Sequence, residues 1–133
     1  MKKNNAEHEF LGLLGRFFTE YLPVSMNASA HTVSSYKCAF RLLFQYLNEE
    51  TEIDARHITF DILNFDLLTG FFDWLVNSRK NSRTTAKQRM GALSSFAEYA
   101  QCRNFEAGCV FRSSLARISK KSFRRVKLSL IHI

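Results

Sequence analysis

The sequence contains few residues that interrupt helices and few that could build a metal site or a disulfide. One Pro and five Gly occur in 133 residues, so long uninterrupted helices are expected. Cys38, Cys102 and Cys109 form no Cys-x-x-Cys pair and are odd in number, which favours reduced thiols in a cytosolic protein. The four histidines lie too far apart for metal-ligand spacing; they are His8, His31, His57 and His132. We therefore expect no metal and no cofactor.

Long hydrophobic runs are also missing. No stretch approaches the roughly 20 apolar residues that a membrane-spanning helix needs. The basic start is interrupted by Glu7 and Glu9, which argues against a signal peptide. These absences predict a cytoplasmic protein without a membrane partner.

No nucleophile with a matched base stands out. All four tyrosines fall on or beside apolar helix faces, where core packing is the expected role; they are Tyr21, Tyr36, Tyr46 and Tyr99. The sequence therefore offers no catalytic residue.

The apolar content is high: 46% of the residues are hydrophobic, and 13 are Phe. A chain of this length can bury a real core and forms one ordinary domain. Together with the scarcity of Pro and Gly, this composition predicts a compact, all-α domain and excludes disorder.

The net charge of +7 is unevenly distributed. Residues 1–78 hold six Lys/Arg and ten Asp/Glu, a net charge of −4, whereas residues 79–133 hold thirteen and two, a net charge of +11. Such asymmetry favours a polyanionic partner for the C-terminal half. A merely soluble basic surface is the alternative.

The most complete helix pattern runs from Ser29 to Asn48. Ser29 is the expected N-cap, with Thr32 three residues later. Apolar residues recur at three- and four-residue steps on one face: Val33, Tyr36, Phe40, Leu43, Phe44 and Leu47. Acidic residues from Glu49 to Asp54 oppose the helix dipole, so we expect the helix to end by about Asn48.

A second stretch, Ser82 to Arg103, repeats this layout 53 residues later. Ser82 corresponds to Ser29, and Thr85 to Thr32. The residues expected to face inward are Ala86, Met90, Leu93, Ala97 and Ala100. The expected outward face contains Thr84, Lys87, Gln88, Gly91, Ser94 and Ser95. We take the two stretches as equivalent helices.

Three further helices are expected, over Glu9–Leu22, Phe65–Asn77 and Ala107–Ile118. Pro23 should end the first, because the residue before a proline avoids helical geometry. On that helix Leu11, Phe18 and Leu22 lie off the main apolar stripe, either as core or as a contact for a second subunit. Asn64 or Asp66 could cap the second, and Trp74 is expected as a core or rim anchor.

The two capped stretches carry a resemblance. Ser-x-x-Thr-x-x-x-Tyr from Ser29, and Ser-x-x-Thr-x-x-x-Arg-x-x-x-Leu-x-x-Phe-x-x-Tyr-Ala from Ser82, resemble the N-terminal core-binding domain of tyrosine recombinases, the phage-integrase and Xer-like family. The resemblance implies a SAM-like bundle of four to five helices over residues 7–118. Residues 119–133 would then be a basic linker and tail, with the catalytic domain absent from this chain.

The resemblance also implies that the two capped helices meet the major groove of double-stranded DNA. Basic side chains would lie at phosphates and short polar ones near base edges. On the first helix the candidates are His31, Thr32, Ser34, Ser35, Lys37 and Arg41. On the second they are Arg83, Thr84, Lys87, Gln88, Arg89, Gly91, Ser94 and Ser95. The tail adds Lys120, Lys121, Arg124 and Arg125.

Gly91 is unusual because glycine inside a helix costs roughly 1 kcal/mol relative to alanine. Either close packing of another helix within the domain or close approach of a DNA backbone would explain it.

In this family the catalytic groups belong to a second domain, so none is carried over and no enzymatic activity is expected. The final LSLIHI departs from the opening expected there and is either a truncation or a foreign tail. By the resemblance, the first helix is a site of self-association on DNA. The rival function is a helical protein–protein interaction module with a basic docking surface. The two differ in whether the Lys and Arg of residues 79–127 share one concave face with Ser34 and Arg41.

Overall fold

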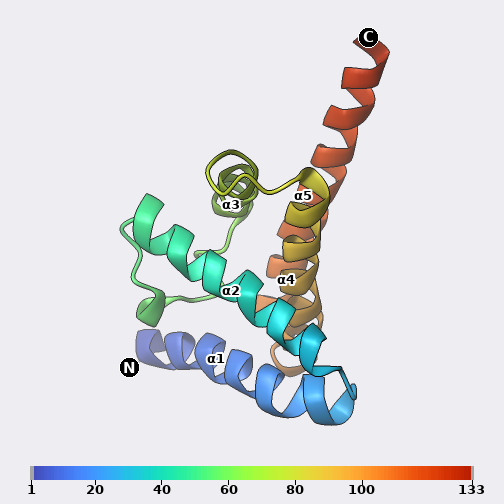
Figure 1. Ribbon diagram of the computed structural model, residues 1–133. Helices are drawn as coiled ribbons and strands as arrows, with labels where there is room; N and C mark the ends of the chain where they lie inside the picture. Colours follow the sequence, from blue (N-terminus) through green and yellow to red (C-terminus); the bar gives the residue numbers. More distant parts are fainter. Residues whose placement is uncertain (1, 133) are drawn as a thin grey trace.

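The computed structural model describes residues 2–132, with side-chain surroundings given for residues 9–118. Every regular element between residues 2 and 132 is helical (Figure 1). The elements are α1 (Lys2–Arg16), the π-helix η1 (Phe17–Ser25), α2 (Ala30–Glu50), the 3₁₀ turn η2 (Ala55–His57), α3 (Phe65–Asn77), α4 (Arg83–Arg103) and α5 (Phe105–His132). The expected all-α bundle is therefore confirmed.

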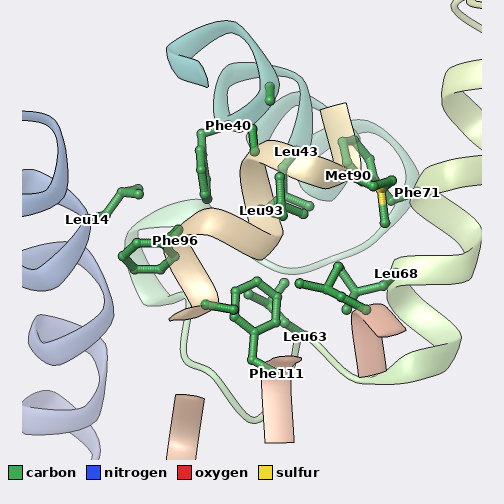
Figure 2. Close-up of a cluster of buried hydrophobic side chains, with 14 of the residues drawn as sticks. Leu14, Phe40, Leu43, Leu63, Leu68, Phe71, Met90, Leu93, Phe96 and Phe111 are labelled. Atoms are coloured by element: carbon green, nitrogen blue, oxygen red, sulfur yellow. The ribbon is translucent and has the colours of Figure 1, made fainter. Parts of the chain in front are cut away.

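One hydrophobic core unites the helices. Figure 2 shows side chains from α1, α2, α3, α4 and α5 converging on it, among them Leu14, Leu43, Phe71, Leu93 and Phe111. The centre is aromatic: the fully buried ring of Phe96 on α4 is surrounded by the rings of Phe10, Phe17, Phe40, Phe60, Tyr99 and Phe111. The helix α4 is therefore the central element against which the others pack.

The two predicted N-caps are confirmed and have the same geometry. The Ser29 hydroxyl accepts the Thr32 amide at 3.1 Å, and the Ser82 hydroxyl accepts the Thr85 amide at 3.1 Å. Each serine hydroxyl also lies 3.0 Å from the threonine hydroxyl that follows it. These bonds satisfy amides that the first helical turn leaves without partners.

The end of α2 differs from the prediction. The helix continues to Glu50 rather than ending by Asn48, and Glu49 and Glu50 lie exposed in its last turn. Thr51 closes it, since its amide and its hydroxyl both donate to the Leu47 carbonyl. Solvent screens the exposed carboxylates, so their opposition to the dipole is too weak to shorten the helix.

The prediction that Pro23 ends the first helix is wrong. Helical structure begins at Lys2 and continues through Pro23 as a π-helix to Ser25. The Met26 amide bonds to the Tyr21 carbonyl, five residues back, at 2.8 Å. The wider π turn leaves room for the proline ring, which has no amide hydrogen to place.

The helix α3 has the predicted bounds. Of the two possible caps, Asn64 is the one used, and its side chain accepts the Leu67 amide at 2.9 Å. Trp74 is buried, with its ring centroid 5.6 Å from that of Tyr46 and 6.2 Å from that of Phe71. Its predicted role as a core anchor is confirmed.

The last helix is longer than predicted. We expected Ala107–Ile118, whereas α5 runs from Phe105 to His132. No Gly or Pro follows Gly108, so nothing in the sequence interrupts the helical backbone. The C-terminal turns extend beyond the other helices (Figure 1). The assignment of residues 119–133 as a linker to a further domain stays a prediction.

Candidate nucleic-acid interface

The outward face of α4 is the largest part of the predicted site that the structure keeps together. The predicted inward residues are all buried: Ala86, Met90, Leu93, Ala97 and Ala100. Arg83, Thr84, Lys87, Gln88 and Gly91 are exposed, and Ser94 is half-buried. The first carboxylate on α4 is Glu98, whose side chain pairs with Arg112 at 3.3 Å. Three turns of α4 therefore present cations and short polar groups without an acidic neighbour on the same helix.

Gly91 lies open on this face. Among the described residues, a Cβ added there would meet nothing within 4 Å. No described side chain of another helix packs against Gly91, so close packing within the described part of the domain does not explain the glycine. Gly70 and Gly108 differ, because a Cβ at Gly70 would collide with the Tyr46 hydroxyl and one at Gly108 with the Gln101 backbone.

A small hollow lies beside this face, at the junction of α3, α4 and α5. Its volume is about 100 Å³, and it is lined by Phe72, Lys87, Met90, Gly91, Ser94, Leu115 and Ile118. Lys87 and Ser94 supply its polar groups, and buried apolar side chains supply most of the remaining lining. A partner crossing α4 at Gly91 would meet a cation and an apolar depression together.

Two candidates on α4 are placed differently. Ser95 turns toward α2, where its hydroxyl lies 3.3 Å from the Tyr36 hydroxyl, so it joins the two capped helices. Arg89 is half-buried, and its Nε is enclosed without a hydrogen-bond partner among the described residues. Neither residue therefore belongs to the exposed outward face of α4 that includes Lys87 and Gly91.

The candidates on α2 divide between two sides of the helix. Ser34, Lys37 and Arg41 line a hollow of about 530 Å³ together with residues of η1 and the turn after it, including Pro23 and Ala28. His31 and Ser35 are exposed roughly 100° away around the helix axis. Thr32 is half-buried and engaged in the cap of α2. No residue of α4 lines the hollow that holds Ser34 and Arg41.

A third hollow runs between α1 and α2. It has a volume of about 380 Å³ and an apolar lining of Leu11, Leu14, Gly15, Phe18, Phe40 and Phe44, with Lys37 and Arg41 at its edge. Leu22, by contrast, is buried in the core. Of the three residues off the main stripe, Leu22 is thus core, Phe18 is half-buried against the core, and Leu11 is exposed. Leu11 and Phe18 both line the hollow.

These arrangements occur in a chain that matches a known family. The phage integrase SAM-like domain model matches residues 13–105, from within α1 to the first residue of α5. The chain belongs to this family. The family resemblance drawn from the two capped motifs is confirmed, and both α2 and α4 lie inside the matched region.

Two curated proteins of Sinorhizobium fredii are similar to this phage integrase SAM-like domain. Both are named as integrase/recombinases: y4rC is 29% identical over 119 residues, which is 90% of this chain and 36% of the relative. The second, y4rD, is 30% identical over 92 residues, which is 68% of this chain and 33% of the relative. The chain thus spans about a third of the length of these relatives. No solved structure matches it significantly.

The described part of this SAM-like domain offers little for chemistry. No group of three His, Cys, Asp or Glu side chains there is arranged to hold a metal ion. Cys38, Cys102 and Cys109 are unpaired. Among the described helices, none is long and apolar enough to cross a membrane. The side chains of Lys120, Lys121, Arg124 and Arg125 lie outside the described residues.

The groups with shifted pKa values do not lie in the α4 face. Hydrogen bonds from Arg56 lower the pKa of Asp54 to about 2. Burial, followed by the charges of Glu50 and Asp73, raises the pKa of Tyr46. Tyr46 and Tyr99 are buried and Tyr21 and Tyr36 pack against the core, which confirms their predicted structural role.

Proposed function

We propose that this domain binds double-stranded DNA as part of a site-specific tyrosine recombinase or integrase acting in the cytoplasm. The observation that carries the proposal is the outward face of α4, which is basic, exposed and free of carboxylates for three turns. A surface of this kind attracts phosphates, and its short polar side chains can approach base edges. Membership of the phage integrase SAM-like family supports the same partner.

Each exposed α4 residue has a role in this proposal. Arg83 and Lys87 contact phosphates, while Thr84 and Gln88 lie near base edges in the major groove. On α2, the exposed residues His31 and Ser35 add contacts to DNA. They lie on the side of α2 that faces away from the hollow between α1 and α2. We propose that Lys37 and Arg41, which line the hollows beside α1 and η1, contribute through longer-range charge.

The test is a double charge reversal on α4. Arg83→Glu with Lys87→Glu should abolish binding of a short duplex in fluorescence anisotropy, because each contact becomes a repulsion. Both side chains are exposed, so the helical circular-dichroism spectrum should not change. Binding by the parent should be modest in sequence preference and steep in salt dependence, since phosphate contacts release condensed counterions.

The matched control is Lys2→Glu with Lys3→Glu, which changes the net charge equally outside the basic half. That pair should change affinity little. Equal loss of binding in the two variants would show that attraction follows net charge alone, and the assignment of a defined α4 surface would then be wrong.

We further propose that the domain does not itself cleave DNA and acts with a catalytic domain carried by the longer protein. Together the two would clamp a duplex from opposite faces. The chain's span of about a third of its relatives is compatible with this arrangement. Incubation with a suicide duplex should yield no tyrosine-linked DNA adduct, and detection of one would refute the non-catalytic role.

The hollow between α1 and α2 favours an accompanying function, self-association of domains on DNA. Leu11, in its lining, is 36% exposed, and a Cβ added at Gly15 would meet none of the described residues within 4 Å, so Gly15 allows close approach of a second chain. Leu11→Asp should remove cooperative binding of a second domain to a two-site duplex and leave single-site affinity unchanged. Unchanged cooperativity would argue against this surface, and the DNA-binding proposal would be unaffected.

A further inference from the structure

We infer that Gly91 is the position at which DNA comes closest to α4, and that a side chain is excluded there for binding, at the expense of helix stability. This inference rests on the proposed DNA-binding function. It assigns to Gly91 a specific role that charge cannot supply: the absence of a Cβ sets how near the duplex can lie to the helix backbone.

Nothing in the described part of the domain requires glycine at this position. Gly91 lies in the middle of α4, and an added Cβ would meet none of the described residues within 4 Å. Its backbone does not have a positive φ, so alanine would fit without strain. Gly70 and Gly108, by contrast, are held to glycine by Tyr46 and Gln101. A helix-weakening residue without an internal reason points to an external one.

The chemistry around Gly91 also suits a DNA strand. Lys87 is one turn earlier on the same exposed face, and Lys87, Gly91 and Ser94 line the hollow beside it. Met90 and Leu115 contribute apolar atoms to that hollow. A cation suits a phosphate, and an apolar depression suits a sugar or a thymine methyl group, which occur together on a DNA strand. Both contacts can form together only if the DNA strand lies against the backbone of α4 at Gly91.

Gly15 is the other glycine whose Cβ would meet nothing within 4 Å. It lines the hollow between α1 and α2, where the surroundings are mainly apolar. Openness alone therefore does not identify a DNA contact. Gly91 differs from Gly15 because it lies one turn after Lys87, on the outward face of α4 that carries no carboxylate before Glu98.

The experiment compares Gly91→Ala with Gly12→Ala in the whole chain. Gly12 is an exposed glycine within α1, where an added Cβ would meet, among the described residues, only the end of the Arg16 side chain, at 3.8 Å. Both substitutions should raise Tm by about 3 to 5 °C, because alanine favours the helix. Only Gly91→Ala should weaken binding of a short duplex, by about tenfold, which is the loss of one good contact.

The charge on α4 is the same in Gly91→Ala and the parent, so the slope of affinity against salt concentration should stay unchanged while the affinity falls. To identify the group that meets the hollow, the duplex is repeated with uracil in place of thymine. If a thymine methyl fills it, the uracil duplex binds the parent more weakly; if a sugar does, the two duplexes bind equally. Either outcome is compatible with close approach at Gly91.

The outcomes separate this inference from the proposed function. If the parent binds DNA and Gly91→Ala binds equally well, the inference is wrong and the DNA-binding proposal stands. If Gly12→Ala loses affinity to the same extent, helix stability and not proximity controls binding, and the inference is again wrong. If the parent does not bind DNA at all, the proposed function fails and the inference fails with it.

Discussion

Replacing Phe96 with alanine should be among the most damaging single changes in this domain. The ring is fully buried, with ring centroids at 5.3 Å for Phe10, 5.4 Å for Phe17 and 5.5 Å for Phe40, all edge to face. A buried Phe→Ala change costs about 3 to 5 kcal/mol, and favourable aromatic pairs add to the burial term. We expect the upper part of that range, since rings from several helices face the cavity and cannot all move inward.

For a chain of 133 residues, a loss of about 4 to 5 kcal/mol lowers Tm by about 15 °C. Thermal and urea denaturation followed by circular dichroism measure this loss. Phe96→Leu keeps most of the volume and should cost less, about 1 to 2 kcal/mol, which keeps the test informative if the alanine variant does not fold.

The matched control is Phe105→Ala. Phe105 lies at the start of α5 and is 70% exposed, so its loss should change stability by no more than about 0.5 kcal/mol. A cost below about 1 kcal/mol for Phe96→Ala, or equal costs for the two positions, would refute the assignment of Phe96 to the centre of the core.

Other changes have equally definite expectations. Ser82→Ala removes the hydroxyl that accepts the Thr85 amide and should lower the unfolding free energy by about 1 kcal/mol in urea titrations, with α4 still formed. Gly108→Ala places a Cβ against the Gln101 backbone and should lower the unfolding free energy by about 1 to 3 kcal/mol. An unchanged unfolding free energy would show that α5 shifts away to make room for the methyl group. The pKa of Tyr46 is raised in the folded state, mainly by burial, so folding keeps the phenol neutral. Stability should therefore fall as the pH rises above 10, the usual pKa of a tyrosine. Over that pH range the Tm of Tyr46→Phe should fall less than the Tm of the parent.

The parts of the fold that depend on local sequence could be predicted. Ser29 and Ser82 cap their helices because a serine hydroxyl reaches an amide three residues later wherever such a turn forms. The bounds of α3 and α4 follow equally from an apolar stripe with a cap at its start.

The differences arise where a distant contact or an unusual turn decides. Pro23 usually ends a helix, but widened π turns accept it, and sequence periodicity does not distinguish those turns. Arg41 is predicted to face DNA together with the outward residues of α4, whereas it lines hollows with α1 and η1. Ser95 is predicted to face outward, yet its hydroxyl lies 3.3 Å from that of Tyr36. How two helices are rotated against each other depends on the packing between them, which the sequence of either helix alone does not determine.

The aromatic centre also determines how the surface helices can move. Phe40 of α2 and Phe96 of α4 share one ring contact, and Tyr36 and Ser95 join the same helices nearer the surface. A change in the angle between α2 and α4 would have to separate these rings, which also pack against α1 and α5. We therefore expect α2 and α4 to keep a fixed relative orientation when they bind a partner, so that the domain loses little conformational entropy on binding. Whatever adjustment the contact requires must then come from the partner, and its stiffness becomes part of what the domain selects.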